Sequence, residues 1–241
     1  MRIADDRLVL GHRLSEWCGH GPILEEDIAL TNIALDLVGE ANLVYQRAAA
    51  VEAAGRDADA LAFLRDAREY RNALIVELPK GDFGFTIVRQ LLFSIHAMHQ
   101  WEALTASADS DIAGIAAKAL KESRYHVRHS AEWVVRLGDG TDESHGRVQD
   151  ALDDLWRHTG ELFMTDGVEQ ALVKKKLAVD SSTLLGAWTR DVTDVITRAT
   201  LRMPGEVYMQ RGGRDGVHTE HLGHMLAEMQ VLPRTYQGAR W

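Results

Sequence analysis

Ile23-Leu-Glu-Glu-Asp-Ile-Ala-Leu-Thr-Asn-Ile-Ala-Leu-Asp-Leu-Val-Gly-Glu-Ala-Asn-Leu-Val-Tyr45 begins the longest helical pattern in this chain of 241 residues. Its apolar positions predict a helix from near Ile23 to about Ala54. They form two neighbouring stripes, the first consisting of Leu24, Ile28, Thr31, Leu35, Val38, Asn42 and Tyr45 and the second of Leu30, Ile33, Leu37, Ala41 and Val44. A helix that is apolar over so much of its circumference is expected to be buried on more than one side, as in the middle of a bundle.

Helical patterns continue on both sides of this stretch, and glycine and proline separate them. The predicted helices cover about 7–18, 59–78, 83–107, 110–137, 143–165, 168–177, 182–201 and 217–232. The chain has only four prolines, widely spaced, which suits long helices and not a protein of strands and turns. No interdomain linker interrupts the pattern. We therefore predict an all-α fold in a single domain, 1–241, built as a long four-helix bundle with additional C-terminal helices.

Composition excludes several classes of protein. The net charge of −9 argues against a general nucleic-acid binder. The sequence has no run of 18 apolar residues, so no membrane span is predicted. Asp5 and Asp6 lie where a signal peptide would have its apolar stretch. The chain has a single cysteine, Cys18, which excludes an intramolecular disulfide and a cysteine-rich metal site. The expectation is a cytoplasmic protein that binds neither nucleic acid nor membrane.

Two helices carry partial matches to a di-iron motif. In four-helix bundles that bind two irons, two helices each supply Glu-x-x-His, because residues three apart project from one helical face. The pattern here is Glu69-Tyr-Arg-Asn72 in one predicted helix and Glu122-Ser-Arg-Tyr-His126 in another. In the first motif asparagine replaces the histidine, and in the second the histidine comes one position late, so both motifs are broken.

Simpler interpretations compete with metal binding. Glu69 and Glu122 are each placed to form surface ion pairs one turn away, with Arg65 and Lys118. Glu26, Asp36 and Glu40 lie among apolar residues of the second helix, and the sequence does not decide which of them corresponds to a lone iron carboxylate. The other candidates are His96, His99, His126 and His129, which either build a metal or proton-relay site or are ordinary core histidines, and His221 with His224. The glycine-rich segment 205–216 has no phosphate-loop ending and is expected to be an ordered loop packed on the bundle or on a partner.

Five stretches together resemble one family along nearly the whole chain. They are Leu8 to Pro22, Leu24 to Leu37, Lys121-Glu-Ser-Arg-Tyr-His126, Arg136-Leu-Gly-Asp-Gly-Thr-Asp142, and His218-Thr-Glu-His-Leu-Gly-His-Met-Leu-Ala-Glu-Met-Gln230. These stretches resemble the C subunits of bacterial ring-1,2-phenylacetyl-CoA epoxidases, the multicomponent oxygenases of phenylacetate degradation.

The resemblance implies a ferritin-like bundle that has lost the iron ligands of its catalytic relative. In that family the C subunit is structural and is no enzyme on its own. It binds and supports the di-iron A subunit within an NADPH- and O2-dependent monooxygenase complex. The cofactors belong to other subunits: the di-iron centre to the A subunit, and flavin and iron–sulfur groups to the NADPH-dependent reductase.

For this chain the resulting hypothesis is a polar remnant of the metal site, formed by Glu69, Asn72, Glu122 and His126, with no catalytic or metal-binding residue. Two alternatives stay open. One is a catalytic di-iron oxygenase with a non-standard ligand set, made of Glu69, Glu122, His126 and a carboxylate of the second helix. The other is a helical binding module whose histidine-rich C-terminal segment recruits a partner.

Overall fold

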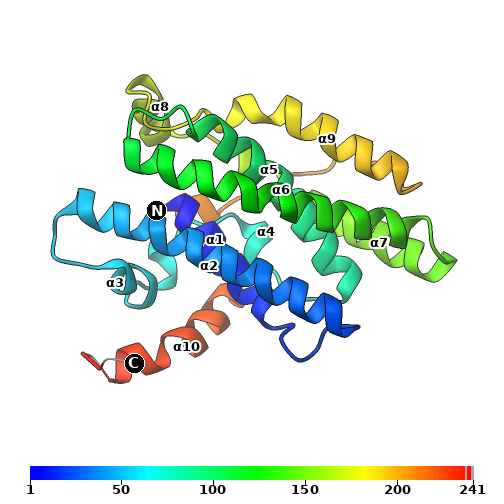
Figure 1. Cartoon of the computed structure of the whole chain (residues 1–241), viewed down its shortest axis with the longest axis horizontal. Helices are drawn as coiled ribbons and strands as arrows, with labels where there is room; N and C mark the ends of the chain where they lie inside the picture. Colours follow the sequence, from blue (N-terminus) through cyan, green and yellow to red (C-terminus); the bar gives the residue numbers. More distant parts are fainter. Residues whose placement is uncertain (237, 240–241) are drawn as a thin grey trace. The chain divides into compact units, whose positions relative to one another are not determined.

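The computed structural model describes residues 1–236 and 238–239, and within that part of the chain every regular element is a helix (Figure 1). The predicted all-α class is therefore confirmed. The α-helices are α1 (Arg2–Ser15), α2 (Leu24–Glu52), α3 (Ala58–Phe63), α4 (Leu74–Glu77), α5 (Phe83–Leu104), α6 (Ser110–Gly138), α7 (Asp142–Trp156), α8 (Gly167–Lys174), α9 (Leu185–Arg198) and α10 (Glu220–Thr235). Four short 3-10 turns accompany them: η1 (Ala67–Glu69), η2 (Gly160–Phe163), η3 (Ser181–Leu184) and η4 (Gly213–Asp215).

Internal contacts divide the chain into two compact units. The first contains residues 1–79 together with 211–241, and the second contains residues 80–210. Compact units of this kind occur within one domain as well as in two, so the single domain stays a prediction.

The first unit is built on α1 and α2, which pack side by side (Figure 1). α4 packs on α1, α3 packs on α2, and α10 contacts α3 and η1. The second predicted stripe of α2, from Leu30 to Val44, is buried in this core. The first stripe is different, because four of its apolar side chains are exposed: Leu24 (71%), Ile28 (51%), Leu35 (64%) and Val38 (37%). The expectation that α2 is buried on more than one side is wrong for these four residues.

The second unit is built around α5, which packs against α6, α7 and α9. The two long helices of this unit, α5 and α6, each begin at an aspartate cap. The carboxylate of Asp82 accepts from the amide of Phe85 at 2.8 Å, and that of Asp109 accepts from the amide of Ile112 at 3.2 Å. The indole of Trp188 on α9 donates to the carbonyl of Leu92 at 2.8 Å and joins α9 to α5. Asp109 is thus the N-cap of α6.

The predicted helix 59–78 is wrong, because the structure has α3, η1, an extended piece and α4 there. Side chains of α1 explain the break. The carboxylates of Asp5 and Asp6 accept from the amides of Arg71 and Ala73, both at 2.8 Å. A continuous helix would use those two amides internally, so the bonds to α1 hold the segment extended.

α2 is also long and apolar enough to cross a membrane, judged only by length and composition, with a mean hydropathy of 1.2 over 18 residues. A helix in the core of a water-soluble protein passes the same test, and 44% of that window is buried. The absence of a membrane span stays a prediction.

Candidate functional site

Glu69 and Asn72 do not share a helical face. Glu69 ends η1, is exposed, and its carboxylate accepts from the amide of Asp66 at 2.8 Å. Tyr70, which follows, is extended, with φ −71° and ψ 151°. The expected ion pair with Arg65 is absent from the contacts of these described residues, where Arg65 instead donates to the main-chain carbonyl of Glu69 at 3.0 Å. Glu69 is therefore a turn-capping residue at the surface, and its predicted place in a polar core is wrong.

Asn72 is fully buried, as the polar-remnant hypothesis requires, but its partners are different ones. Its side-chain amide donates to Glu77 Oε2 at 2.8 Å. The same carboxylate lies 2.7 Å from Nδ1 of His218 and accepts from the amide of Thr219 at 2.6 Å. We call Asn72, Glu77, His218 and Thr219 the Glu77 cluster. It fastens the segment before α10 to α4 within the first unit.

Glu122 and His126 lie on α6 in the second unit. Glu122 is half-buried, and its carboxylate is 3.5 Å from the ammonium of Lys118. This is the surface ion pair that the sequence offered as the simpler interpretation. His126 is buried at 2% exposure, and its ring packs against that of Tyr125 with centroids 6.1 Å apart.

The other predicted histidines also have structural contacts. His96 is fully buried and meets Phe163 edge-on at 5.4 Å, while His99 Nε2 lies 2.7 Å from Asp191. His221 contributes its carbonyl, which accepts from Arg13 at 3.0 Å. Throughout residues 1–236 and 238–239, no three histidine, cysteine, aspartate or glutamate side chains converge on a common point.

Sequence reasoning missed the main polar feature of the first unit, three consecutive charged residues of α1 that are all buried: Asp5, Asp6 and Arg7. Asp5 accepts from the hydroxyl of Tyr45 at 2.6 Å and from the guanidinium of Arg65 at 2.6 Å. That guanidinium also lies over the ring of Tyr70, 4.1 Å from its centroid. Burial raises the pKa of both tyrosines, so the two phenols stay protonated beside the ion pair of Asp5 and Arg65.

Asp6 and Arg7 contact different parts of the first unit. Asp6 forms a two-pronged ion pair with Arg214 of η4, with both N–O distances 2.9 Å. Arg7 donates from Nε to Glu40 of α2 at 2.9 Å, and the two side chains are 0% and 2% exposed. Burial lowers the pKa of Arg7, and the charge of Glu40 opposes that shift.

These contacts bear on one of the three carboxylates that the sequence left open. Glu40 was one of three carboxylates considered as the lone iron ligand of the second helix, and it faces a buried guanidinium. A carboxylate so neutralised is poorly suited to hold a cation. With Glu69 at the surface and Asn72 bonded to Glu77, these candidates of the first unit do not fit the role of iron ligands.

The glycine-rich segment completes the same unit, because η4 packs closely on residues 68–74. A Cβ at Gly213 would lie 2.2 Å from the carbonyl oxygen of Asn72, so only glycine fits there. The structure thus shows residues 211–216 packed on their own chain. Arg214 is the residue that the sequence reasoning overlooked here, and its partner is 208 positions away.

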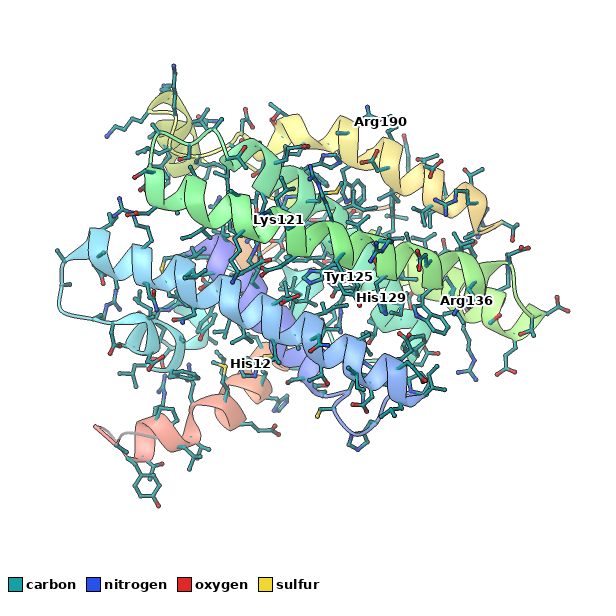
Figure 2. All side chains as sticks on the ribbon, viewed as in Figure 1. His12, Lys121, Tyr125, His129, Arg136 and Arg190 are labelled. Carbon is teal, nitrogen blue, oxygen red and sulfur yellow. The ribbon has the colours of Figure 1, made fainter. Side chains whose placement is uncertain are left out.

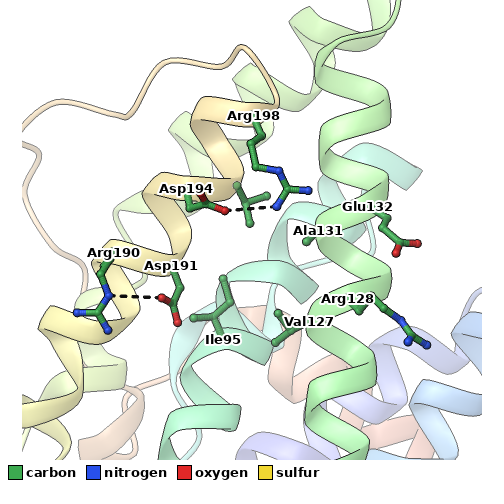
Figure 3. A pocket seen from close by; sticks show the side chains of 10 residues that line it. Ile95, Val127, Arg128, Ala131, Glu132, Arg190, Asp191, Asp194 and Arg198 are labelled. Atoms are coloured by element: carbon green, nitrogen blue, oxygen red, sulfur yellow. Dashed lines mark hydrogen bonds and ion pairs between the residues drawn. The ribbon is translucent and has the colours of Figure 1, made fainter.

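A pocket of about 510 Å³ opens in the second unit beside α5, α6 and α9 (Figure 3). Its floor is apolar and its rim carries arginine–aspartate pairs, Arg198 with Asp194 at 3.3 Å and Arg190 with Asp191 at 3.8 Å. Three arginines and three carboxylates line it, so their charges balance. None of the predicted site residues lines this pocket.

His12 is expected to make the stability of the first unit depend on pH. This half-buried residue of α1 is labelled in Figure 2, and burial lowers the pKa of its imidazole below the usual 6.5. As the pH decreases below 6.5, the unfolded chain takes up a proton on this histidine more readily than the folded chain does. The free energy of unfolding therefore decreases as the pH is lowered, until the pKa of the folded state is passed. We expect wild type to lose more stability than His12→Asn between pH 7.5 and 5.5 in urea titrations. Equal losses would show that another group is responsible.

Comparison with known proteins places the chain. The family described as phenylacetic acid catabolic protein matches residues 1–241. A curated relative from Escherichia coli K12, named as the C subunit of 1,2-phenylacetyl-CoA epoxidase, is 48% identical over 241 residues, which are 100% of this chain and 97% of that protein. The matched family is ferritin-like, which agrees with the helical architecture. This chain belongs to the phenylacetic acid catabolic protein family.

Proposed function

We propose that this chain is the structural C subunit of a phenylacetyl-CoA epoxidase, which binds and supports a di-iron catalytic A subunit in aerobic phenylacetate catabolism. The observation that carries the proposal is the 48% identity, along the full chain, to a protein named as the C subunit of that epoxidase. In this proposal the chain is cytoplasmic, holds no cofactor and has no activity alone. The iron belongs to the A subunit, and flavin, iron–sulfur groups and NADPH belong to the reductase.

The buried charges of the first unit support a structural role. Asp5, Asp6 and Glu40 each face an arginine of the same chain, and Glu77 faces His218 and Asn72. The arginine pairs join α1 to α2, to Arg65 and to Arg214, and the Glu77 cluster joins α4 to the segment before α10. They hold a fold together and leave these carboxylates engaged with cationic and amide donors.

Copurification with metal analysis tests this function. Tagged chain is purified alone and after coexpression with the A subunit of the same organism, and iron is measured in each preparation. We expect less than about 0.1 iron per chain alone, and an iron-containing complex after coexpression, because the carboxylates above are already paired. Two irons in the isolated chain, with O2 consumption, would instead support the alternative of a catalytic di-iron oxygenase with a non-standard ligand set.

A further inference from the structure

We propose that the exposed stripe of α2 is the face on which a helix of the catalytic partner subunit docks, an inference that rests on the proposed function. We call Leu24, Ile28, Leu35 and Val38, with Thr31 and Asn42 in the same register, the α2 seam. Its four large apolar side chains are 37–71% exposed. Single exposed apolar residues are ordinary, whereas four in one line mark an interaction surface.

The spacing of the seam favours a helix as the occupant. Its members follow one another at steps of four and three residues from Leu24 to Asn42. This repeat of 3.5 residues keeps one line of side chains facing a second helix that packs alongside. Thr31 and Asn42 interrupt the apolar line with neutral polar groups, a device that fixes the register of a helix pair.

Another helix of the same length shows what an ordinary solvent face of this chain looks like. α6 also has 29 residues, and its exposed positions are mostly charged; Figure 2 labels two of them, Lys121 and Arg136. The charged positions include Lys118, Lys121, Arg124, Arg128, Glu132 and Arg136. Most exposed positions of α6 therefore carry charge, with Gly114, Ala117 and Tyr125 among the exceptions, whereas the α2 seam carries none.

The lack of charge on the exposed face of α2 also indicates what kind of partner surface fits it. From Ile28 onward, the exposed positions of α2 as far as Ala50 are all uncharged, in a chain of net charge −9: Ile28, Asn32, Leu35, Val38, Asn42, Gln46 and Ala50. A neutral face fits a neutral, apolar face of another protein. An anionic lipid surface fits poorly, because the first turn of α2 carries Glu25, Glu26 and Asp27.

The area of the seam argues against a second copy of this chain as the occupant. Four side chains at these exposures form an apolar patch on the order of 400 Å². Two identical seams packed on each other would bury about 800 Å², which is typical of crystal contacts and below the roughly 1,200 Å² of stable interfaces.

Leu35→Glu is the direct test, with Val51→Glu as its matched control. The two side chains are 64% and 66% exposed on the same helix, and 16 residues of helical rotation put Val51 nearly opposite the seam. The binding of purified A subunit to the immobilised full-length chain is measured by biolayer interferometry. Leu35→Glu is expected to weaken it at least 100-fold, since a carboxylate would be buried without a partner, and Val51→Glu less than threefold. Circular dichroism and urea unfolding of both variants should match wild type.

The outcomes separate this inference from the proposed function. If wild type binds the A subunit and Leu35→Glu binds equally well, the seam is not the docking face and the proposed function stands. If folded wild type does not bind the A subunit, the proposed function fails. If wild type alone sediments as a dimer that Leu35→Glu dissociates, or binds phosphatidylglycerol vesicles through Leu35, then a second copy or a membrane is the occupant and the inference is overturned.

Discussion

Asp5→Asn is expected to lower the free energy of unfolding by about 3–5 kcal/mol, because it leaves the guanidinium of Arg65 buried without its counter-ion. Arg65 and Asp5 are 4% and 0% exposed, so water cannot replace the lost carboxylate. Asparagine is nearly isosteric and can still accept from the hydroxyl of Tyr45, but it also replaces the oxygen that accepts from the amide of Arg71, so the loss includes that hydrogen bond. Urea unfolding followed by circular dichroism measures the loss.

Asp66→Asn is the control for this prediction. Asp66 also pairs with an arginine, Arg234, at 2.9 Å, but its side chain is 77% exposed. Exposed pairs contribute about 0–1 kcal/mol, and asparagine retains the oxygen that caps η1. A similar loss in the two variants would mean that burial of the Asp5 pair contributes nothing special to stability.

Arg7→Met and Glu40→Leu are each expected to destabilise the chain by about 3–5 kcal/mol, whereas the double variant should be more stable than either single one. Each single change leaves one buried charge facing an apolar side chain. The double change removes both charges and fills the same space with apolar groups. A double-mutant cycle of urea unfolding energies gives the coupling directly.

The exposed pair of Arg198 and Asp194, at 55% and 67% exposure, is the reference cycle. Its coupling should be only about 0.3–0.5 kcal/mol, as for other helical pairs four residues apart. Simple additivity at Arg7 and Glu40 would show that the two charges do not depend on each other. The identification of their pairing as a structural contact would then be wrong.

Local patterns predicted most helices well, because a helix depends on neighbours three and four residues away. The predicted span of the second helix differs from α2 by one or two residues at each end, and the predicted helix 110–137 matches α6 within one residue. The same logic failed at 59–78. There, two carboxylates of α1, more than 60 positions earlier, bind main-chain amides and hold the segment extended.

The candidate site shows the same limit. Reading Glu-x-x-Asn as a broken iron motif assumed a helix, and Glu69 and Asn72 instead occupy a turn and an extended piece. The Lys118–Glu122 pair was foreseeable, since both residues lie on one helix. No periodicity marks Asp5, Asp6 and Arg7 as core residues, because burying a charge depends on a partner that only the fold supplies.

The sequence by itself determined the all-α class, most helix boundaries and the family. All of these follow from local spacing or from similarity along the chain. Only the tertiary structure decided which apolar stripe of α2 is buried and which carboxylates are neutralised by arginine. The reason is physical: a side chain's exposure and its electrostatic partner depend on residues 33 to 208 positions away, as Arg7 with Glu40 and Asp6 with Arg214 show.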